Sequence, residues 1–331
     1  MVSIKDVAKY ANVSVATVSR VLNNKDTVSE GTEKIVKEAI EALNYRPNLV
    51  ARTLYKKRSS MIGLILPDIT NPFFPALARA IEDKALSYGF TVILCNADGN
   101  AKKEMDYIKS LEQKYIDGFI ISTSQLEVEN YDQFDFPVVA LDRFIKNEIP
   151  TVMANNEEGA FKATKHLMEV NCKLIAHVRG PSGVGPADDR EKGFLKAVKE
   201  STIKYTIVET DYDLYTAEKV AYQLLQNNPE IDGIFAGSDL IAAGVMRAAN
   251  HVGLLIPHDL QIVGFDGIQL GKMLSPSLTT IEQPIYEMGA MAVELLYKQI
   301  EKLDLEKLHY KFSTKLIKGE TTKNTRGFIN E

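Results

Sequence analysis

The sequence has few of the residues that build metal centres or disulfide frameworks. Its 331 residues include two cysteines, Cys95 and Cys172, which lie 77 positions apart and form no Cys-x-x-Cys pair. We therefore expect two buried, reduced thiols rather than a disulfide or a metal pair. None of the five histidines has another histidine at metal-ligand spacing. These absences predict a protein with no metal and no cofactor.

Long apolar runs and a leader pattern are also missing. No window approaches the ~18 uncharged apolar residues that a membrane helix needs. Residues 1–6 contain no basic segment followed by an apolar core, so we expect no secretory signal and a cytoplasmic location. With 45% hydrophobic and 25% charged residues, the composition is that of a globular protein and excludes a fibrous or disordered chain. The length predicts roughly two or three domains.

The net charge of −5 is unevenly distributed along the chain. Residues 1–60 carry 11 basic and 6 acidic side chains, whereas the remaining 271 residues carry 28 basic and 38 acidic ones. A basic head on an acidic body predicts that the head contacts a polyanion. Solvated surface charge alone can produce the same division, so the charge distribution does not by itself establish a nucleic-acid partner and sequence motifs are needed.

Residues 1–46 have the pattern of a helix-turn-helix domain. A first helix runs from Ile4 to Ala11, Ser14 can cap a second helix over residues 15–22, and a third is expected over residues 30–43. The side chains expected to form the core between these helices are Ile4, Val7, Ala8, Ala11, Val18, Val21, Leu22, Ile35, Ala39, Ile40 and Leu43.

The outward face of the second helix carries small and hydrogen-bonding side chains, which suit a recognition helix in a major groove. The candidate DNA contacts here are Ser14, Val15, Ala16, Thr17, Ser19, Arg20 and Asn23. From the pattern alone, a three-helix bundle that binds only protein stays an alternative.

Three segments of the head carry a specific resemblance. They read IKDVA at residues 4–8, VSVATVSRVLN at residues 13–23 and YRPN at residues 45–48, and in this order they resemble the head of the lactose/galactose-repressor (LacI/GalR) family. The resemblance implies a DNA-binding transcriptional repressor and adds Tyr45 to the candidate DNA contacts.

Residues 47–60 are expected to form a hinge helix and linker. The helix begins at Pro47-Asn48 and has barely two turns, so it is marginal in isolation and needs a partner to persist. In the resembled family, two such helices pair across a dimer in the minor groove, and a leucine enters the central base step. The resemblance gives Leu54 this role, with Asn48, Val50 and Ala51 beside it. In the alternative interpretation, Leu54 is the last apolar residue before a linker.

Short apolar runs alternate with amphipathic stretches over residues 61–331. The expected strands are residues 61–66, 90–94, 118–122, 137–141, 174–178, 207–210, 233–236, 262–265 and 278–281. The expected helices are residues 75–88, 102–115, 157–170, 188–200, 215–227, 239–252 and 284–301. This alternation predicts an α/β body with parallel sheets, and its length predicts two subdomains. We expect an N-subdomain at about 61–160 and 290–318, and a C-subdomain at about 161–289 and 319–331.

Polar and aromatic residues follow most of the expected strands, where open α/β sheets bind ligands. The candidate ligand contacts are Asn71, Phe73, Phe74, Asp142, Arg143, Arg190, Tyr212, Ser238, Asp266 and Gln283. Rings can stack on an apolar sugar face, while carboxylates, amides and guanidinium groups bind hydroxyls. A small neutral polyol fits this set better than a purine or an anion. Taken singly, each aspartate can be a loop cap and each phenylalanine a core residue.

These candidates also resemble the contact set of ribose-binding periplasmic proteins and of ribose-type repressors within the same family. The resemblance covers the chain from Ile4 to about Lys318. Ser238-Asp239 stands where ribose binders usually have Asn-Asp, so the polyol class is better supported than the pentose.

The function expected is that of a homodimeric, non-enzymatic repressor that reads a palindromic operator and is released by a ribose-like sugar. The basic head and the missing export signal disfavour an importer component. No nucleophile-elbow, phosphate-loop or dinucleotide motif supports an enzyme, although Asp142 and Asp266 could in principle act as a glycosidase pair. The alternative within the family is a catabolite regulator with a seryl-phosphorylated phosphocarrier protein as corepressor. Glu294, at the aligned basic position, would repel that phosphate.

Overall fold

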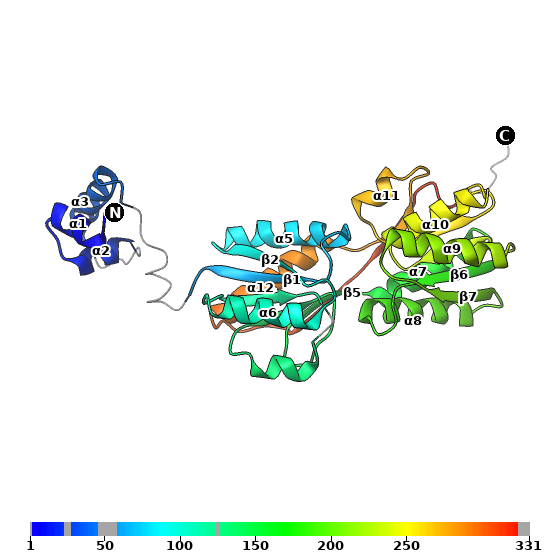
Figure 1. Ribbon diagram of the computed structural model, residues 1–331, viewed down its shortest axis with the longest axis horizontal. Coiled ribbons are helices and arrows are strands. Elements are labelled where there is room, and N and C mark those ends of the chain that lie inside the picture. Colours follow the sequence, from blue (N-terminus) through cyan, green and yellow to red (C-terminus); the bar gives the residue numbers. More distant parts are fainter. Residues whose placement is uncertain (1, 23–27, 46–57, 124–125, 324–331) are drawn as a thin grey trace. The chain divides into compact units, whose positions relative to one another are not determined.

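A computed structural model describes residues 2–22, 28–45, 58–123 and 126–323 (Figure 1). The chain divides into two compact units, residues 1–59 and residues 60–331, which we call the head and the body. Within the described parts of the chain, no helix is both long and apolar enough to cross a membrane.

The head is built from three helices around a small apolar core. They are α1 (Ile4–Tyr10), α2 (Val15–Leu22) and α3 (Glu30–Ala42). Val7, Val18 and Val36 are fully buried where the three helices meet. The apolar faces predicted for the first two helices are therefore confirmed.

The predicted core face of the third helix is wrong at one position. Ile35 was expected to cover the other helices, but half of its surface is exposed, and Val36 is buried in its place. Ala39, Ile40 and Leu43 pack against the head core as expected. Because Val36, Ala39, Ile40 and Leu43 follow the three-and-four spacing of one helical face, the phase set by these positions excludes Ile35.

The body contains two six-stranded sheets, each of which defines a subdomain. The sheet of the N-subdomain has the order β11-β5-β4-β3-β1-β2 and is parallel throughout. Its strands are β1 (Met61–Leu66), β2 (Thr91–Asn96), β3 (Gly118–Ile121), β4 (Val138–Leu141), β5 (Thr151–Ala154) and β11 (His309–Phe312). The α/β class with parallel sheets is thus confirmed.

The sheet of the C-subdomain has the order β12-β10-β9-β8-β6-β7. Its strands are β6 (Leu174–Arg179), β7 (Lys204–Glu209), β8 (Gly233–Ala236), β9 (Gln261–Asp266), β10 (Thr279–Glu282) and β12 (Lys315–Ile317). All neighbours are parallel except β12, which pairs antiparallel with β10 at one edge.

Helices cover both faces of each sheet, and an apolar core lies on each face. The helices of the body are α5 (Phe73–Ser87), α6 (Ala101–Glu112), η1 (Val128–Gln133), α7 (Asn156–Glu169), α8 (Gly185–Lys199), α9 (Leu214–Asn227), α10 (Asp239–His251), α11 (Gln269–Met273) and α12 (Ile285–Ile300). In the N-subdomain, α5 and α12 pack side by side over one face, and α6 lies on the other. In the C-subdomain, α9 and α10 cover one face, and α7 and α8 cover the other.

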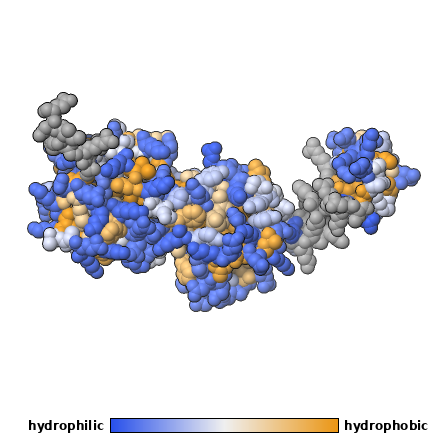
Figure 2. All heavy atoms as spheres, turned by 180° about the vertical axis from the view of Figure 1, so that it is seen from behind, coloured by the Kyte–Doolittle hydropathy of each residue, from blue (hydrophilic) through white to orange (hydrophobic). Residues whose placement is uncertain are grey.

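The chain passes between the two subdomains three times: after β5, before α12, and between β11 and β12. The expected boundary near residue 160 falls inside α7, which packs on the second sheet. The expected boundary near residue 290 falls inside α12, which packs on the first. On the face of the body seen in Figure 2, hydrophilic side chains predominate and hydrophobic ones form small separate patches.

Candidate functional site

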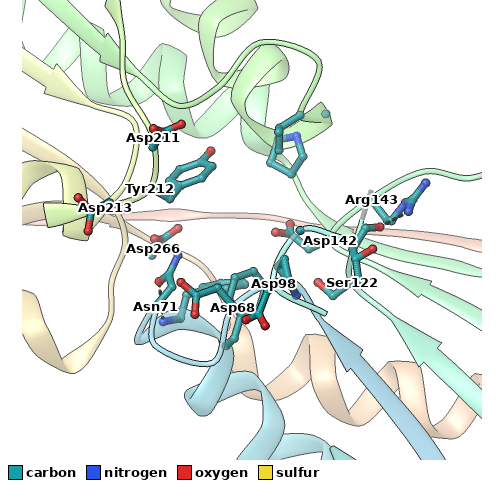
Figure 3. Close-up of a pocket in the computed structure, with 18 of the residues that line it drawn as sticks. Asp68, Asn71, Asp98, Ser122, Asp142, Arg143, Asp211, Tyr212, Asp213 and Asp266 are labelled. Atoms are coloured by element: carbon teal, nitrogen blue, oxygen red, sulfur yellow. Dashed lines mark hydrogen bonds between the residues drawn. The ribbon is translucent and has the colours of Figure 1, made fainter. Parts of the chain in front are cut away.

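A cavity of about 540 Å³ lies in the body, lined by loops that follow the strands of both sheets (Figure 3). The structure brings eight of the ten candidate ligand residues to its wall. They are Asn71, Phe73, Phe74, Asp142, Arg143, Arg190, Tyr212 and Asp266. The ligand-site prediction, made from the carboxyl ends of parallel strands, thus identifies residues that share one space.

The loop after β1 places an amide and two rings at the wall. The Asn71 side-chain oxygen accepts the backbone N–H of Phe73 at 3.1 Å, which fixes the turn that starts α5. The rings of Phe73 and Phe74 pack edge to face with centroids 5.2 Å apart. Phe73 also belongs to the core beneath, so it holds the wall rigid while Phe74 stays partly accessible.

Asp142 follows β4 and contributes a carboxyl group to the cavity wall. Its backbone has φ +56°, a left-handed conformation that costs free energy for a residue other than glycine. Burial raises the pKa of Asp142 to about 7, with Asp266 adding to the shift and Arg190 opposing it. Its Oδ1 is buried and has no hydrogen-bond partner among the described residues. The group is therefore poised to accept a hydrogen bond from a ligand.

Arg143 lines the same wall, but its side chain extends away from Asp142 and Asp266 in Figure 3. Its Nη1 donates to the carbonyl oxygen of Thr123 and, at 3.4 Å, to the hydroxyl of Tyr131. Thr123 and Tyr131 in turn donate through their hydroxyl groups to Glu104 of α6, a fully buried carboxyl group. Burial raises the pKa of Glu104, while Thr123 and Arg143 oppose the shift. This ring of contacts fixes Arg143 to the N-subdomain.

Arg190 of α8 is the fixed cation on the opposite wall. Its Nε donates to the Asn156 side chain at 2.9 Å, and its Nη1 donates to the Gly237 carbonyl at 2.6 Å. Its Nη2 lies 3.4 Å from Oδ1 of Asp266, and the guanidinium stacks over the Phe265 ring at 3.9 Å. A guanidinium held on all sides needs little reorganisation when a ligand arrives.

Asp266 ends β9 and faces the cavity. Gln283 donates to its Oδ1 at 2.7 Å. Burial raises the pKa of Asp266 to about 6, although Arg190 and Gln283 oppose the shift. Gln283 is buried and does not line the cavity, so its observed contact is with Asp266.

Tyr212 supplies the ring on the C-subdomain side. It lies against Gly180, where a Cβ atom would come within 2.4 Å of the ring, so the close approach depends on glycine. Burial raises the pKa of the Tyr212 hydroxyl to about 12, so the hydroxyl is neutral at physiological pH. Ser238, by contrast, is buried outside the cavity wall, and its hydroxyl accepts the Ile241 N–H at 3.1 Å as the N-cap of α10.

Several wall residues were missed by the candidate set. Asp98 and Gly99 follow β2, Ser122 follows β3, and Asp213 caps α9. Each lies just beyond a strand end, which is the signal that could have identified them. Together the lining residues include six aspartates and two arginines, the aspartates being Asp68, Asp98, Asp142, Asp211, Asp213 and Asp266. The cavity wall is therefore rich in hydrogen-bond acceptors.

In the head, the start of α2 presents the predicted contact face. Val15, Ala16 and Arg20 are exposed, and Thr17 is partly exposed. The Ser14 hydroxyl caps the helix by accepting the Thr17 N–H at 3.0 Å, and the two hydroxyls lie 2.8 Å apart. Ser19 is half-buried on the same helix, and Tyr45 packs against the head core. Asn23, Asn48, Val50, Ala51 and Leu54 lie outside the described residues.

Among the described residues, no group of three histidine, cysteine or acidic side chains is arranged to hold a metal ion. Cys95 and Cys172 are both free and buried, and burial raises the pKa of each thiol.

Two family profiles together match almost the whole chain. The profile described as "Bacterial regulatory proteins, lacI family" matches residues 3–48, and "Periplasmic binding proteins and sugar binding domain of LacI family" matches residues 59–322. The chain therefore belongs to the LacI family of bacterial regulatory proteins.

Several curated relatives match this chain over nearly its full length. A ribose operon repressor from Halalkalibacterium halodurans is 55% identical, with 98% of both chains covered. A ribose operon repressor from Bacillus subtilis is 39% identical, with 98% of this chain and 99% of the relative covered. A catabolite control protein A from Priestia megaterium is also 39% identical, over 91% of this chain and 93% of the relative.

Solved structures are similar in fold and carry ligands or DNA. A LacI-family regulator from Alkaliphilus metalliredigens, complexed with D-xylulofuranose, has a TM-score of 0.75 at 37% identity and covers 80% of this chain and all of that one. A regulator from Enterococcus faecium with bound ribose has a TM-score of 0.73 at 30% identity, over 79% and 98% of the two chains. A lac repressor dimer bound to operator has a TM-score of 0.86 at 26% identity, over 97% and 99%.

Proposed function

We propose that this protein is a sugar-responsive transcriptional repressor. Its head binds a palindromic operator as part of a homodimer, and its body binds a ribose-like sugar that lowers operator affinity. The observation that carries the sugar assignment is the buried Asp142 oxygen that has no partner among the described residues and stands on a wall shared with Arg190, Asp266 and aromatic rings.

The cavity chemistry supports a neutral, unphosphorylated sugar. Tyr212 and Phe74 can cover the apolar faces of a sugar ring, while Asp142 and Asp266 can accept hydrogen bonds from its hydroxyl groups and Arg190 can donate hydrogen bonds to its oxygen atoms. A phosphate group in the cavity would face six aspartates and two arginines. One of the two arginines, Arg143, is already bonded to Thr123 and Tyr131. Like-charge repulsion between these carboxylates and a phosphate group disfavours a sugar phosphate.

The head chemistry supports binding to a major groove. The exposed Arg20 and the small side chains of Val15 and Ala16 leave α2 free to approach base edges and phosphates. One recognition helix per head, together with the dimeric relative bound to operator, supports a twofold complex that reads a palindrome. Leu54 in the hinge segment is the proposed wedge in the central base step.

The catabolite-regulator alternative has weaker support. The carboxylate of Glu294 on α12 pairs with Lys298 at 3.0 Å, so this lysine is already matched by a carboxylate. A phosphoserine docking there would meet that carboxylate.

Calorimetry and operator binding on the full chain test the proposal. We expect ribose or a related pentose to bind, ribose 5-phosphate to bind more weakly, and operator affinity to fall as the sugar is added. The phosphorylated phosphocarrier protein alone should leave operator affinity unchanged. If the phosphorylated phosphocarrier protein raises operator affinity and no sugar changes it, the protein is a catabolite regulator and the proposal is wrong.

A further inference from the structure

Asp266 holds a strained backbone conformation at the cavity wall. Its φ is +118°, and the following Gly267 has φ +73°. A non-glycine residue in this region costs free energy, and it persists only where its surroundings enforce it. The conformation turns the Asp266 carboxyl group toward the cavity, so whatever enforces it also sets the position of a proposed sugar contact.

Asp239, the first residue of α10, supplies that constraint. Its Oδ2 accepts the Ile268 N–H at 2.9 Å. The turn that follows Asp266 is therefore tied to the start of α10 by this carboxyl group.

Two further contacts fix Asp239 itself. The Thr280 hydroxyl on β10 donates to its Oδ1 at 2.5 Å. Its Oδ1 also lies over Gly264 of β9, where a Cβ atom would come within 2.5 Å. The carboxyl group thus fills a space between β9 and β10 that a side chain at position 264 would occupy.

Helix capping does not explain this arrangement. Ser238 already caps α10 through Ile241, so the helix start is satisfied without the carboxyl group of Asp239. Asp239 is fully buried, and burial together with the neighbouring Asp266 raises its pKa well above the usual range. A carboxyl group kept where its charge is disfavoured indicates a role that a smaller residue cannot fill.

We propose that Asp239 is a positioning residue of the sugar site, which holds the Asp266–Ile268 turn so that Asp266 meets the ligand. This role rests on the proposed sugar-binding function. Asp239 does not line the cavity, so it acts through Asp266 rather than by touching the sugar. It would set affinity without contributing to the list of ligand contacts.

The test is ribose affinity, measured by calorimetry on the full chain, alongside the free energy of unfolding. Asp239→Ala should weaken ribose binding at least tenfold. Asp239→Asn keeps a carbonyl oxygen within reach of the turn and should stay within threefold of wild type. If the alanine variant does not fold, Asp239→Ser, whose hydroxyl is too short to reach the turn, should show the same tenfold loss.

Asp232 provides the matched control. It lies just before β8, whereas Asp239 lies just after it, and its carboxylate accepts the backbone N–H groups of Lys173 and Leu174 at 2.8 to 3.0 Å. Asp232→Ala removes a similar set of hydrogen bonds at the far end of the sheet. It should lower stability and leave ribose affinity within twofold of wild type.

A double-mutant cycle separates positioning from general loosening. In an Asp266→Ala background, Asp239→Ala should cost no more than a further twofold in ribose affinity, because the positioned group is already gone. A full tenfold loss in that background, or an equal loss in Asp232→Ala, would overturn the role. If the wild type binds ribose and Asp239→Ala binds it equally well, the positioning role alone is overturned. Absence of any sugar binding to the wild type would overturn the proposed function together with it.

Discussion

At the scale of single residues, the cavity depends on carboxyl groups that burial holds partly protonated near neutral pH. Asp142 has a pKa of about 7 and Asp266 one of about 6 in the free protein, in both cases because burial disfavours the charge. A sugar hydroxyl that donates to either group favours the ionised form. Sugar binding should therefore release protons.

This linkage predicts a pH dependence of sugar affinity. Between pH 8 and pH 6 the affinity for ribose should fall roughly tenfold, because Asp142 must give up a proton to bind at the lower pH. Asp142→Asn should bind more weakly and lose most of this dependence. Calorimetry in two buffers of different ionisation enthalpy counts the protons released. Equal wild-type affinity at both pH values would contradict the assignment.

His177 of β6 predicts an acid-sensitive fold. Its ring stacks on Phe235 and Phe194, its Nδ1–H donates to the Phe235 carbonyl at 3.0 Å, and burial lowers its pKa to about 3. Because the unfolded histidine titrates near 6.5, this contribution to stability is complete above pH 6.5 and declines as the pH falls toward 3.

The expected slope is about 1.4 kcal/mol per pH unit below that value. Between pH 7.5 and pH 5.5, urea unfolding of the wild type should therefore show a loss about 1.4 kcal/mol greater than that of His177→Asn, whose amide can still donate to the Phe235 carbonyl. The buried aspartates shift stability in the opposite direction in both proteins, so the difference between the two isolates His177. If the wild type and His177→Asn lose stability equally between the two pH values, His177 does not contribute to the acid sensitivity.

At the scale of elements, strands and helices with a clear hydrophobic period could be predicted from the sequence. The strand expected at residues 61–66 and that at 233–236 agree with β1 and β8. The sequence did not predict β5, β11 or β12, which have three or four residues each. Their runs are too short for a period, and β11 and β12 are edge strands defined by pairing partners far away in the chain.

At the site, too, the sequence predicted only those residues whose position follows from a clear pattern. Residues that end a strand, such as Asp142 and Asp266, were predictable because topology alone brings strand ends together. The cap formed by Ser238 and the fixation of Arg143 by Thr123 and Tyr131 depend on side-chain directions that a sequence pattern does not contain. Positioning contacts of this kind emerge only from the folded arrangement.

The phase of α3 can be tested by paired substitutions in the head. Val36→Ala removes fully buried methyl groups and should destabilise the head by about 2 kcal/mol. Ile35→Ala removes a larger side chain that is half exposed and should cost less than about 0.5 kcal/mol. Amide hydrogen exchange of α1–α3 in the full chain measures both. If Ile35→Ala destabilises the head more than Val36→Ala does, Ile35 faces the core as the sequence predicted.

At the scale of the whole molecule, the proposed repressor works only if sugar and operator oppose each other through the chain. Linkage requires that the factor by which ribose weakens operator binding equals the factor by which operator weakens ribose binding. Arg190→Ala removes the fixed guanidinium of the cavity and should leave operator affinity unchanged while abolishing release by ribose. Leu54→Ala should do the reverse, weakening operator binding while ribose affinity is kept. Anisotropy of a labelled operator with and without ribose, and calorimetry with and without operator, measure the two factors independently. Operator affinity that is the same with and without saturating ribose, or an Arg190→Ala protein that ribose still releases, would show that the cavity in the body does not control the head.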